Sequence, residues 1–241
     1  MPAVFGQAGM EHMRRYGTTQ EQFAKVAVKN HKHSTKNPLS QYQNEVGLED
    51  VLKARMVAYP NTLYMCCPTG DGAAAALVIS PEKARQLGAR VKVLASVLTS
   101  DPWTERDLTL PDVSTLTRNA ARKAYELAGI GPQDLDLVEL HDCFATAELL
   151  HYENLGLCKD GEAGRMIDEG ESAHGGRIPV NVSGGLLSKG HPLGATGVAG
   201  IFEVTSHLRG SAGARQVPGA KVGLSHVIGL GSACTINVLG V

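Results

Sequence analysis

The sequence predicts a layered α/β fold in which a mixed β-sheet is flanked by helices. Between residues 91 and 140, an apolar strand, a helix and a second apolar strand follow one another, and this order is typical of such layers. The chain has 241 residues, of which 43% are hydrophobic and 20% charged, so it can bury a sizeable core in one large domain or two smaller ones.

The first 60 residues are polar and show helical spacing, and we expect no strand there. Thr18 and Glu21 have the spacing of a capping box at the start of a helix. After a turn rich in Pro and Gly, the apolar run 73–79 predicts a buried strand. Ser80 follows as the N-cap of a short helix.

The rest of the chain alternates between strand and helix signals. Gly129 stops the first of these helices, as a left-handed C-terminal residue does. We expect strands at 91–98 and 135–140, helices at 114–128, 144–155 and 195–208, a Gly-rich turn from Ser183, and two closing strands joined by Gly229, Leu230 and Gly231.

Charge and cysteine content exclude several classes of function. The formal net charge is −1 and no basic run is present, which excludes a nucleic-acid or anionic-membrane role. Five cysteines without a CxxC pair indicate a reducing compartment and give no zinc–thiolate cage. We expect no transmembrane segment, because no apolar run approaches ~20 residues.

The two ends of the sequence bear on location. The start has no signal pattern and the end is not a peroxisomal tripeptide, so we expect a cytoplasmic protein, or a peroxisomal one in a eukaryote.

The first candidate for chemistry is the run His141, Asp142, Cys143, Phe144, which lies where a predicted strand gives way to a helix. Open α/β sheets usually place their sites at this edge. The imidazole can hold a carbonyl oxygen and the thiol can move protons. The alternative is a strand-end histidine beside a buried structural cysteine.

The second candidate is the Gly-rich run 181–197. Gly185 and Gly190 have the interval of a P-loop, but His191 and Pro192 replace the Lys-Ser/Thr pair that a nucleoside triphosphate needs. Proline restricts the backbone of His191, which aims its imidazole as a catalytic donor requires. The alternative is a structural Gly-rich turn.

The remaining candidates favour structural interpretations. The turn at 229–231 joins two strands. Cys66 and Cys67 lie in an apolar stretch and are read as packed thiols. His31 and His33 have no third ligand for a metal, so we predict no metal site and a solvated surface there.

Taken together, the His141–Phe144 run, the Gly190–Pro192 run and the turn at 229–231 resemble the carboxyl-terminal half of a thiolase. More narrowly, they resemble the thiolase domain of the sterol carrier protein x and bacterial lipid-transfer-protein type. The likeness covers nearly the whole chain and includes the runs 29–34, 66–69 and 71–75.

The resemblance implies a division of the chain. Residues 1–60 are similar to the end of the thiolase loop domain, and residues 61–90 to the last strand and helix of the amino-terminal thiolase domain. Residues 91–241 are similar to the carboxyl-terminal thiolase domain.

The resemblance also implies catalytic roles. His191 would activate a nucleophile and hold the thioester oxygen, and His141 would serve an oxyanion hole. Most thiolases have a second cysteine in a Cys-x-Gly turn, but Gly229 stands there, so Cys143 would be the acid/base. Gly231 would still offer its backbone N–H to an oxyanion.

Substrate contacts follow from the same likeness. Ser183, Gly184 and Lys32 would bind substrate, with Lys32 contacting a phosphate. Coenzyme A would be a substrate, and no permanently bound cofactor is expected.

The stretch that carries the family's nucleophilic cysteine has no counterpart in this sequence, so we expect the chain alone to be inactive in thiolysis. It would need a second chain that completes the amino-terminal half, or a homo-oligomer. Three functions stay open: part of a 3-oxoacyl-CoA thiolase acting on fatty, branched or steroid acyl-CoA, a thiolase-like retro-aldolase with a small partner subunit, and a non-catalytic acyl-CoA or lipid-binding subunit.

Overall fold

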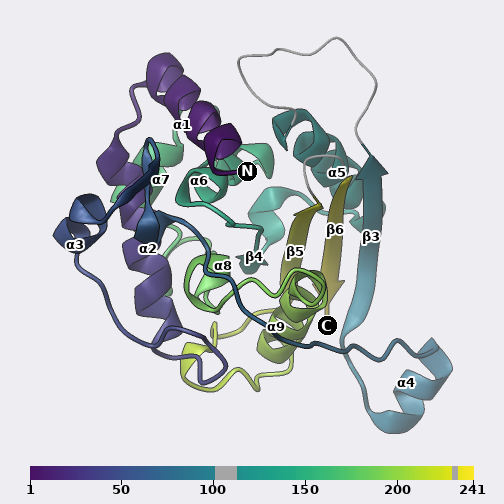
Figure 1. The fold of residues 1–241 in the computed structure, drawn as a ribbon. Coiled ribbons are helices and arrows are strands. Elements are labelled where there is room, and N and C mark those ends of the chain that lie inside the picture. The colour runs from purple at the N-terminus through teal and green to yellow at the C-terminus, as the bar shows by residue number, and fades with distance from the viewer. Residues whose placement is uncertain (101–112, 230–232) are drawn as a thin grey trace.

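The computed structural model describes residues 1–100, 113–229 and 233–241 of the chain. A mixed β-sheet with helices on both faces stands beside a group of helices from the amino-terminal part of the chain (Figure 1). The helices are α1 (Pro2–Tyr16), α2 (Gln20–Ser34), α3 (Leu48–Lys53), α4 (Pro81–Leu87), α5 (Val113–Ala128), α6 (Ala145–Asn154), α7 (Ala163–Asp168), α8 (Gly185–Ser188) and α9 (Thr196–Leu208).

The main sheet has four strands in the order β3-β6-β5-β4. Its strands are β3 (Lys92–Ser100), β4 (Leu137–Glu139), β5 (Val222–Gly229) and β6 (Ala233–Gly240). The pairs β3–β6 and β6–β5 are antiparallel, and β5–β4 is parallel. The predicted mixed sheet is confirmed, together with the strand, helix, strand order from which it was inferred.

The two faces of this sheet bury separate cores, because successive side chains of a strand point to opposite faces. On β4, Val138 packs into a core shared with Leu116 of α5, whereas the preceding Leu137 packs into a second core shared with Val204 of α9. Helices α5 and α9 therefore cover opposite faces of the sheet (Figure 1).

The helices of the amino-terminal part pack onto α6 and its neighbours. Helix α2 lies at the centre of this group and contacts α3, α6, α7 and α8, while α1 contacts α6. The capping box of α2 is formed by Thr19 and Gln22, one residue beyond the predicted pair. The hydroxyl of Thr18 instead bonds the ring of His12. This packing places the carboxyl-terminal end of α2 against the site.

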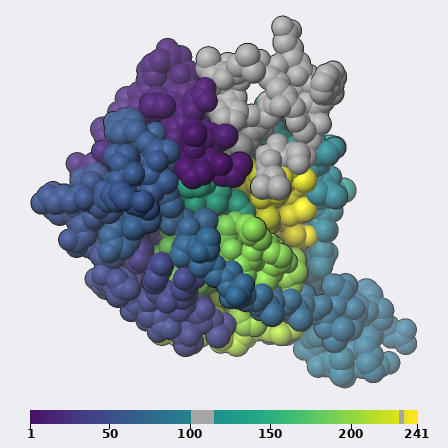
Figure 2. All heavy atoms as spheres, in the orientation of Figure 1, coloured from purple at the N-terminus to yellow at the C-terminus, as the bar shows by residue number. Residues whose placement is uncertain are grey.

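The predicted buried strand at 73–79 was wrong. In this segment Leu77 and Val78 are 85% and 82% exposed and the backbone joins no β-ladder of the described residues. An apolar run becomes a strand only where a neighbour takes its backbone groups, and this run leads away from the body to the exposed helix α4, which protrudes in Figure 2.

Two smaller outcomes concern the same region. A hairpin of β1 (Met56–Ala58) and β2 (Asn61–Thr62) forms where no strand was expected. The cap of α4 is confirmed, since the Ser80 hydroxyl accepts the N–H of Lys83 at 3.2 Å. The division at residues 60 and 90 stays a prediction. Within the described ranges, no helix is long and apolar enough to cross a bilayer.

Candidate active site

The end of β4 carries the first half of the candidate site. The chain leaves the sheet after Glu139, turns through His141, Asp142 and Cys143, and enters α6. All three side chains of this turn are buried, at 6%, 0% and 8% exposure. The predicted strand-to-helix edge is therefore an interior position, and these groups act in a low-dielectric setting.

The second half comes from the loop between α8 and α9, about fifty residues further along the chain. This loop brings the half-buried His191 against His141, with ring centroids 4.9 Å apart and ring planes at 83°. The two motifs that the sequence marked separately thus form one site. An edge-to-face pair of imidazoles can present two ring nitrogens to a single oxygen or sulfur atom.

Hydrogen bonds fix the tautomer of His191. Its Nδ1 lies 2.7 Å from the Thr196 hydroxyl oxygen, and that hydroxyl donates to the carbonyl of Pro192 at 3.0 Å. Because the single hydroxyl proton of Thr196 is used, Nδ1 must carry the proton that joins the pair. The Nε2 of His191 is then an acceptor, as a general base requires. Burial and the Lys189 charge lower the pKa of His191, which keeps its ring neutral.

His141 is also held neutral. Burial and the neighbouring His191 and His151 lower its pKa to about 3. Its Nδ1 is fully buried and has no hydrogen-bond partner among the described residues. An unpaired buried ring nitrogen costs free energy, so this atom is available to bond a substrate atom or a water.

The thiols of the chain are held in their protonated form. Burial raises the pKa of Cys143, which also lies beside Cys67 and Asp142. Burial likewise raises the pKa of Cys66 to about 11 and that of Cys67, Cys158 and Cys234 to about 12. Because the thiolate is the nucleophile, none of these five groups is poised to attack at neutral pH.

Asp142, the second residue of the His141–Phe144 run, anchors the turn. Its carboxylate accepts the N–H groups of Leu186 and Leu187 at the start of α8, at 2.7 and 3.3 Å, and the amide of Asn30 at 2.8 Å. Burial raises its pKa well above the ordinary range. Asp142 therefore ties the site turn to both α2 and α8.

A buried ion pair behind this turn was also missed. The Lys29 ammonium lies 2.5 Å from Glu148 of α6 and donates to the carbonyl of Val180 at 2.8 Å. Glu148 also accepts from Asn30, Asn181 and Tyr152. In the sequence, Lys29 follows the apolar Val26 by three residues, so both lie on the same face of the helix. This spacing could have indicated that Lys29 faces the core.

The proposed substrate contacts lie at different depths. The Ser183 hydroxyl donates to Glu139 at 2.6 Å, and both Ser183 and Gly184 are buried beneath the end of α2. Lys32 is exposed on α2. Gly231 lies outside the described residues. The binding roles of these residues stay predictions.

The expected solvated surface at His31 and His33 was wrong, since these side chains are 2% and 4% exposed. The ring of His33 bonds the carbonyl of Asn181 at 3.0 Å and takes the N–H of His174 at 3.0 Å, and burial lowers its pKa to about 3. His31 stacks on Tyr42 with ring centroids 5.9 Å apart. The two histidines lie on different sides of α2, and both are buried because the chain around Tyr42 covers one side and the chain around Asn181 covers the other.

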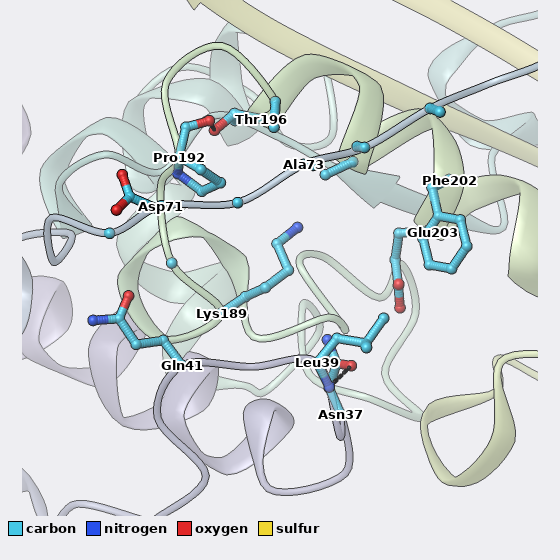
Figure 3. Close-up of a pocket in the computed structure, with 17 residues that line it drawn as sticks. Asn37, Leu39, Gln41, Asp71, Ala73, Lys189, Pro192, Thr196, Phe202 and Glu203 are labelled. Carbon is cyan, nitrogen blue, oxygen red and sulfur yellow. Dashed lines mark hydrogen bonds between the residues drawn. The ribbon is translucent and has the colours of Figure 1, made fainter.

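A cavity of about 720 Å³ borders the His191 loop and α9. Figure 3 shows the Lys189 side chain pointing into its middle, with Leu39 on one side, Pro192 and Thr196 on the other, and Phe202 at one end. Its volume lies within the ~300 to 1,000 Å³ of ordinary binding sites. The cavity therefore gives access to the loop that holds His191.

This fold, with paired neutral imidazoles beside a buried thiol, defines a thiolase-like α/β protein. Residues 100–240 match the model of the family described as Thiolase C-terminal domain-like. The chain belongs to the thiolase superfamily and corresponds to the carboxyl-terminal part of its sterol-carrier type, as the motifs predicted.

Similar proteins support this assignment. The chain is 49% identical to sterol carrier protein 2 of Rattus norvegicus, covering 98% of this chain and 44% of the rat protein. It is 44% identical to an acetyl-CoA acetyltransferase of Methanothermobacter thermautotrophicus, covering 95% of this chain and 60% of that protein. The Ltp2-ChsH2(DUF35) aldolase matches with a TM-score of 0.84 and 27% identity, covering 100% of this chain and 63% of that chain. The chain thus spans about half the length of the curated relatives it matches.

Proposed function

We propose that this chain supplies the oxyanion donor, the general base and the general acid of a 3-oxoacyl-CoA thiolase acting on fatty, branched or steroid acyl-CoA. The observation that carries the proposal is the edge-to-face pair of His141 and His191, two neutral imidazoles at 4.9 Å. Donors at a developing oxyanion are commonly worth ~3 to 4 kcal/mol.

In the proposed reaction, Nε2 of His191 takes the proton of an incoming thiol, and the thiolate attacks the 3-oxo carbon. The bond between C2 and C3 breaks, the acyl group stays on sulfur, and the acetyl-CoA enolate receives a proton from Cys143. A CoA thiol then gives its proton to the Cys143 thiolate and its sulfur attacks the acyl carbon; the first sulfur leaves as a thiolate and takes its proton back from His191, which frees the shortened acyl-CoA. A raised thiol pKa suits the first of these Cys143 steps, because the proton is present at neutral pH.

The attacking thiol is proposed to come from outside these 241 residues. All five thiols of the chain have raised pKa values, which disfavours each of them as the nucleophile. The cavity beside the His191 loop provides room for a completing segment, supplied by a second chain, another copy or the remainder of a longer protein.

The test is the intact mass of the purified chain after incubation with a 3-oxoacyl-CoA and CoA, alongside an assay for released acetyl-CoA. We expect no adduct and no release from the chain alone, and release once an amino-terminal thiolase half is added. His191→Ala should abolish that release. An acyl adduct on one of the five cysteines would overturn the proposal, whereas saturable binding without turnover in the completed protein would favour a binding subunit.

The likeness to the Ltp2-ChsH2(DUF35) aldolase favours a second candidate, a retro-aldol cleavage of a 3-hydroxyacyl-CoA. Here a base removes the hydroxyl proton, the bond between C2 and C3 breaks, and the enolate is protonated. No acyl-cysteine forms and a small partner subunit would assist. Cleavage of a 3-hydroxyacyl-CoA without added CoA would distinguish this reaction from thiolysis.

A further inference from the structure

The backbone where β4 ends is held by side chains in place of strand neighbours. Strand β4 pairs with β5 through Glu139 and Ser225, and on its other edge Val138 bonds the chain around Val180. Beyond Glu139 the ladders stop, although His141 still has a backbone N–H that points toward β5. A buried N–H without an acceptor would cost ~1 to 3 kcal/mol.

Two side chains supply the missing acceptors. The N–H of His141 donates to Nδ1 of His226 at 3.4 Å, and the N–H of Leu140 donates to the amide oxygen of Asn181 at 2.8 Å. Asn181 has φ 53, and among the described residues it alone combines a positive φ with a side chain. Its backbone carbonyl is thereby turned away to His33, and its amide oxygen occupies the acceptor position.

The tautomer of His226 is determined by its partners. Nδ1 accepts from His141, so the ring proton lies on Nε2, which donates to the Thr117 hydroxyl at 3.3 Å. Thr117 in turn bonds the thiol of Cys234. The ring is 1% exposed and packs against His151 with centroids 4.5 Å apart. A protonated His226 would lose the acceptor, and its burial opposes that protonation.

We propose that His226 is a positioning residue for the reaction proposed above: its Nδ1 replaces a strand carbonyl and fixes the backbone of His141, and thereby the angle at which the His141 imidazole meets His191. In this role it acts through His141 and not by contact with substrate. This inference rests on the proposed function for its catalytic meaning, and the geometry it describes can be measured without any activity.

The first test uses the unmodified chain with ¹⁵N-labelled histidine, assigned by single His→Gln variants. We expect His226 to show a protonated Nε2 and an unprotonated Nδ1 throughout pH 5 to 8, the range in which ordinary histidines titrate. A proton on Nδ1 of His226 would overturn the proposal without reference to any variant.

The second test compares His226→Asn, whose amide oxygen can replace Nδ1, with His226→Leu, which has no acceptor. In His226→Leu the ring signals of His141 should shift, and its titration should move up to above about pH 5 as the turn loosens. In His226→Asn both should stay near those of the unmodified chain. Thr117→Val, which removes the partner of Nε2 and the bond to Cys234 but leaves Nδ1 free to accept, is the matched control and should leave His141 unshifted.

Activity separates this inference from the proposed function. In the completed thiolase, His226→Leu should lower kcat on the order of 100-fold with little change in KM, the cost of a small misplacement, and His226→Asn should restore most of it. Unchanged His141 signals in folded His226→Leu would overturn the positioning role. Shifted signals, with no thioester chemistry even from the unmodified completed protein, would remove the proposed function and leave the positioning role standing.

Discussion

Replacing Glu148 by Gln tests whether the buried polar network behind the site holds the fold together. The Glu148 side chain is fully buried in α6. Its two oxygens accept from the Lys29 ammonium at 2.5 Å, Asn30 at 2.7 Å, Asn181 at 2.8 Å and the Tyr152 hydroxyl at 2.5 Å. Four donors converge on one carboxylate, so the network depends on both of its oxygens.

The amide of glutamine keeps the shape of the side chain but turns one acceptor into a donor and leaves the buried Lys29 without its counter-charge. Removing one partner of a buried pair costs ~3 to 5 kcal/mol. In a chain of this size each kcal/mol lowers Tm by ~2 to 4 °C, so Glu148→Gln should lower Tm by about 6 to 20 °C.

Thermal unfolding followed by circular dichroism at pH 7 measures this loss. Glu126→Gln is the control, because Glu126 is 62% exposed and pairs with Arg122 on the surface at 3.3 Å, which predicts a change within ~1 kcal/mol. If Glu148→Gln lowers Tm no more than the control does, the network does not stabilise the fold. The double variant Lys29→Met with Glu148→Gln should recover part of the loss, since it leaves no unpaired charge and keeps one oxygen as an acceptor for Asn30 and Asn181.

Three further predictions concern the site. Thr196→Val should shift the tautomer ratio of His191 by a factor of about 5, the equivalent of one hydrogen bond of ~1 kcal/mol, seen in ¹⁵N spectra. The folded-state pKa of His151, about 3, lies below its ordinary value of 6.5, so the unfolded chain binds a proton on this ring that the folded chain does not. The free energy of unfolding should therefore fall as pH drops below 6.5, by about 1.4 kcal/mol per pH unit for this group. Urea unfolding at several pH values measures this slope. Gly185→Ala should cost about 2 to 5 kcal/mol, because φ is +59° and a Cβ would strike a buried carboxylate. Gly194→Ala, which meets open space, is its control and is also compared by urea unfolding.

Each of these has a contrary outcome. An unchanged tautomer ratio in Thr196→Val would mean that the Thr196 hydroxyl does not determine which ring nitrogen of His191 carries the proton. An acid slope that is the same in His151→Gln would mean that this ring is not buried as a neutral group. Equal stability of the two alanine variants would show that the interior at Gly185 has room for a side chain.

The sequence predicted the strand, helix and motif order well because these features have local causes. The end of β4 and the start of α6 follow from apolar runs and turn residues around His141, and the restricted backbone before Pro192 follows from local sterics. The capping box moved by one residue, to Thr19, because neighbouring threonines offer the backbone equivalent hydroxyls and the ring of His12 takes the other one.

The failures share a different cause, which is dependence on distant partners. The apolar run at 73–79 needs an adjacent strand to become one itself, and local composition cannot supply it. The polar residues of α2, including Lys29 and His33, look solvated in sequence, but Glu148 and Asn181 satisfy them from more than a hundred positions away. A buried polar group is tolerated only when it has a hydrogen-bond or charge partner, and that partner is brought to it by the tertiary structure.

The protonation states in the site define what the proposed thiolysis requires from outside these residues. His141 is neutral, Cys143 holds its proton, and His191 presents an unprotonated Nε2. These groups can accept one proton, donate one proton and bind an oxyanion, but they include no group that attacks carbon at neutral pH. In the proposed thiolysis, the incoming thiol would then lie within about 3 Å of Nε2 of His191, the distance at which a base removes a proton. A cysteine scan of an added amino-terminal half, read by crosslinking to a cysteine placed at His191, would locate it, and a segment that crosslinks nowhere near this loop would refute the division of roles.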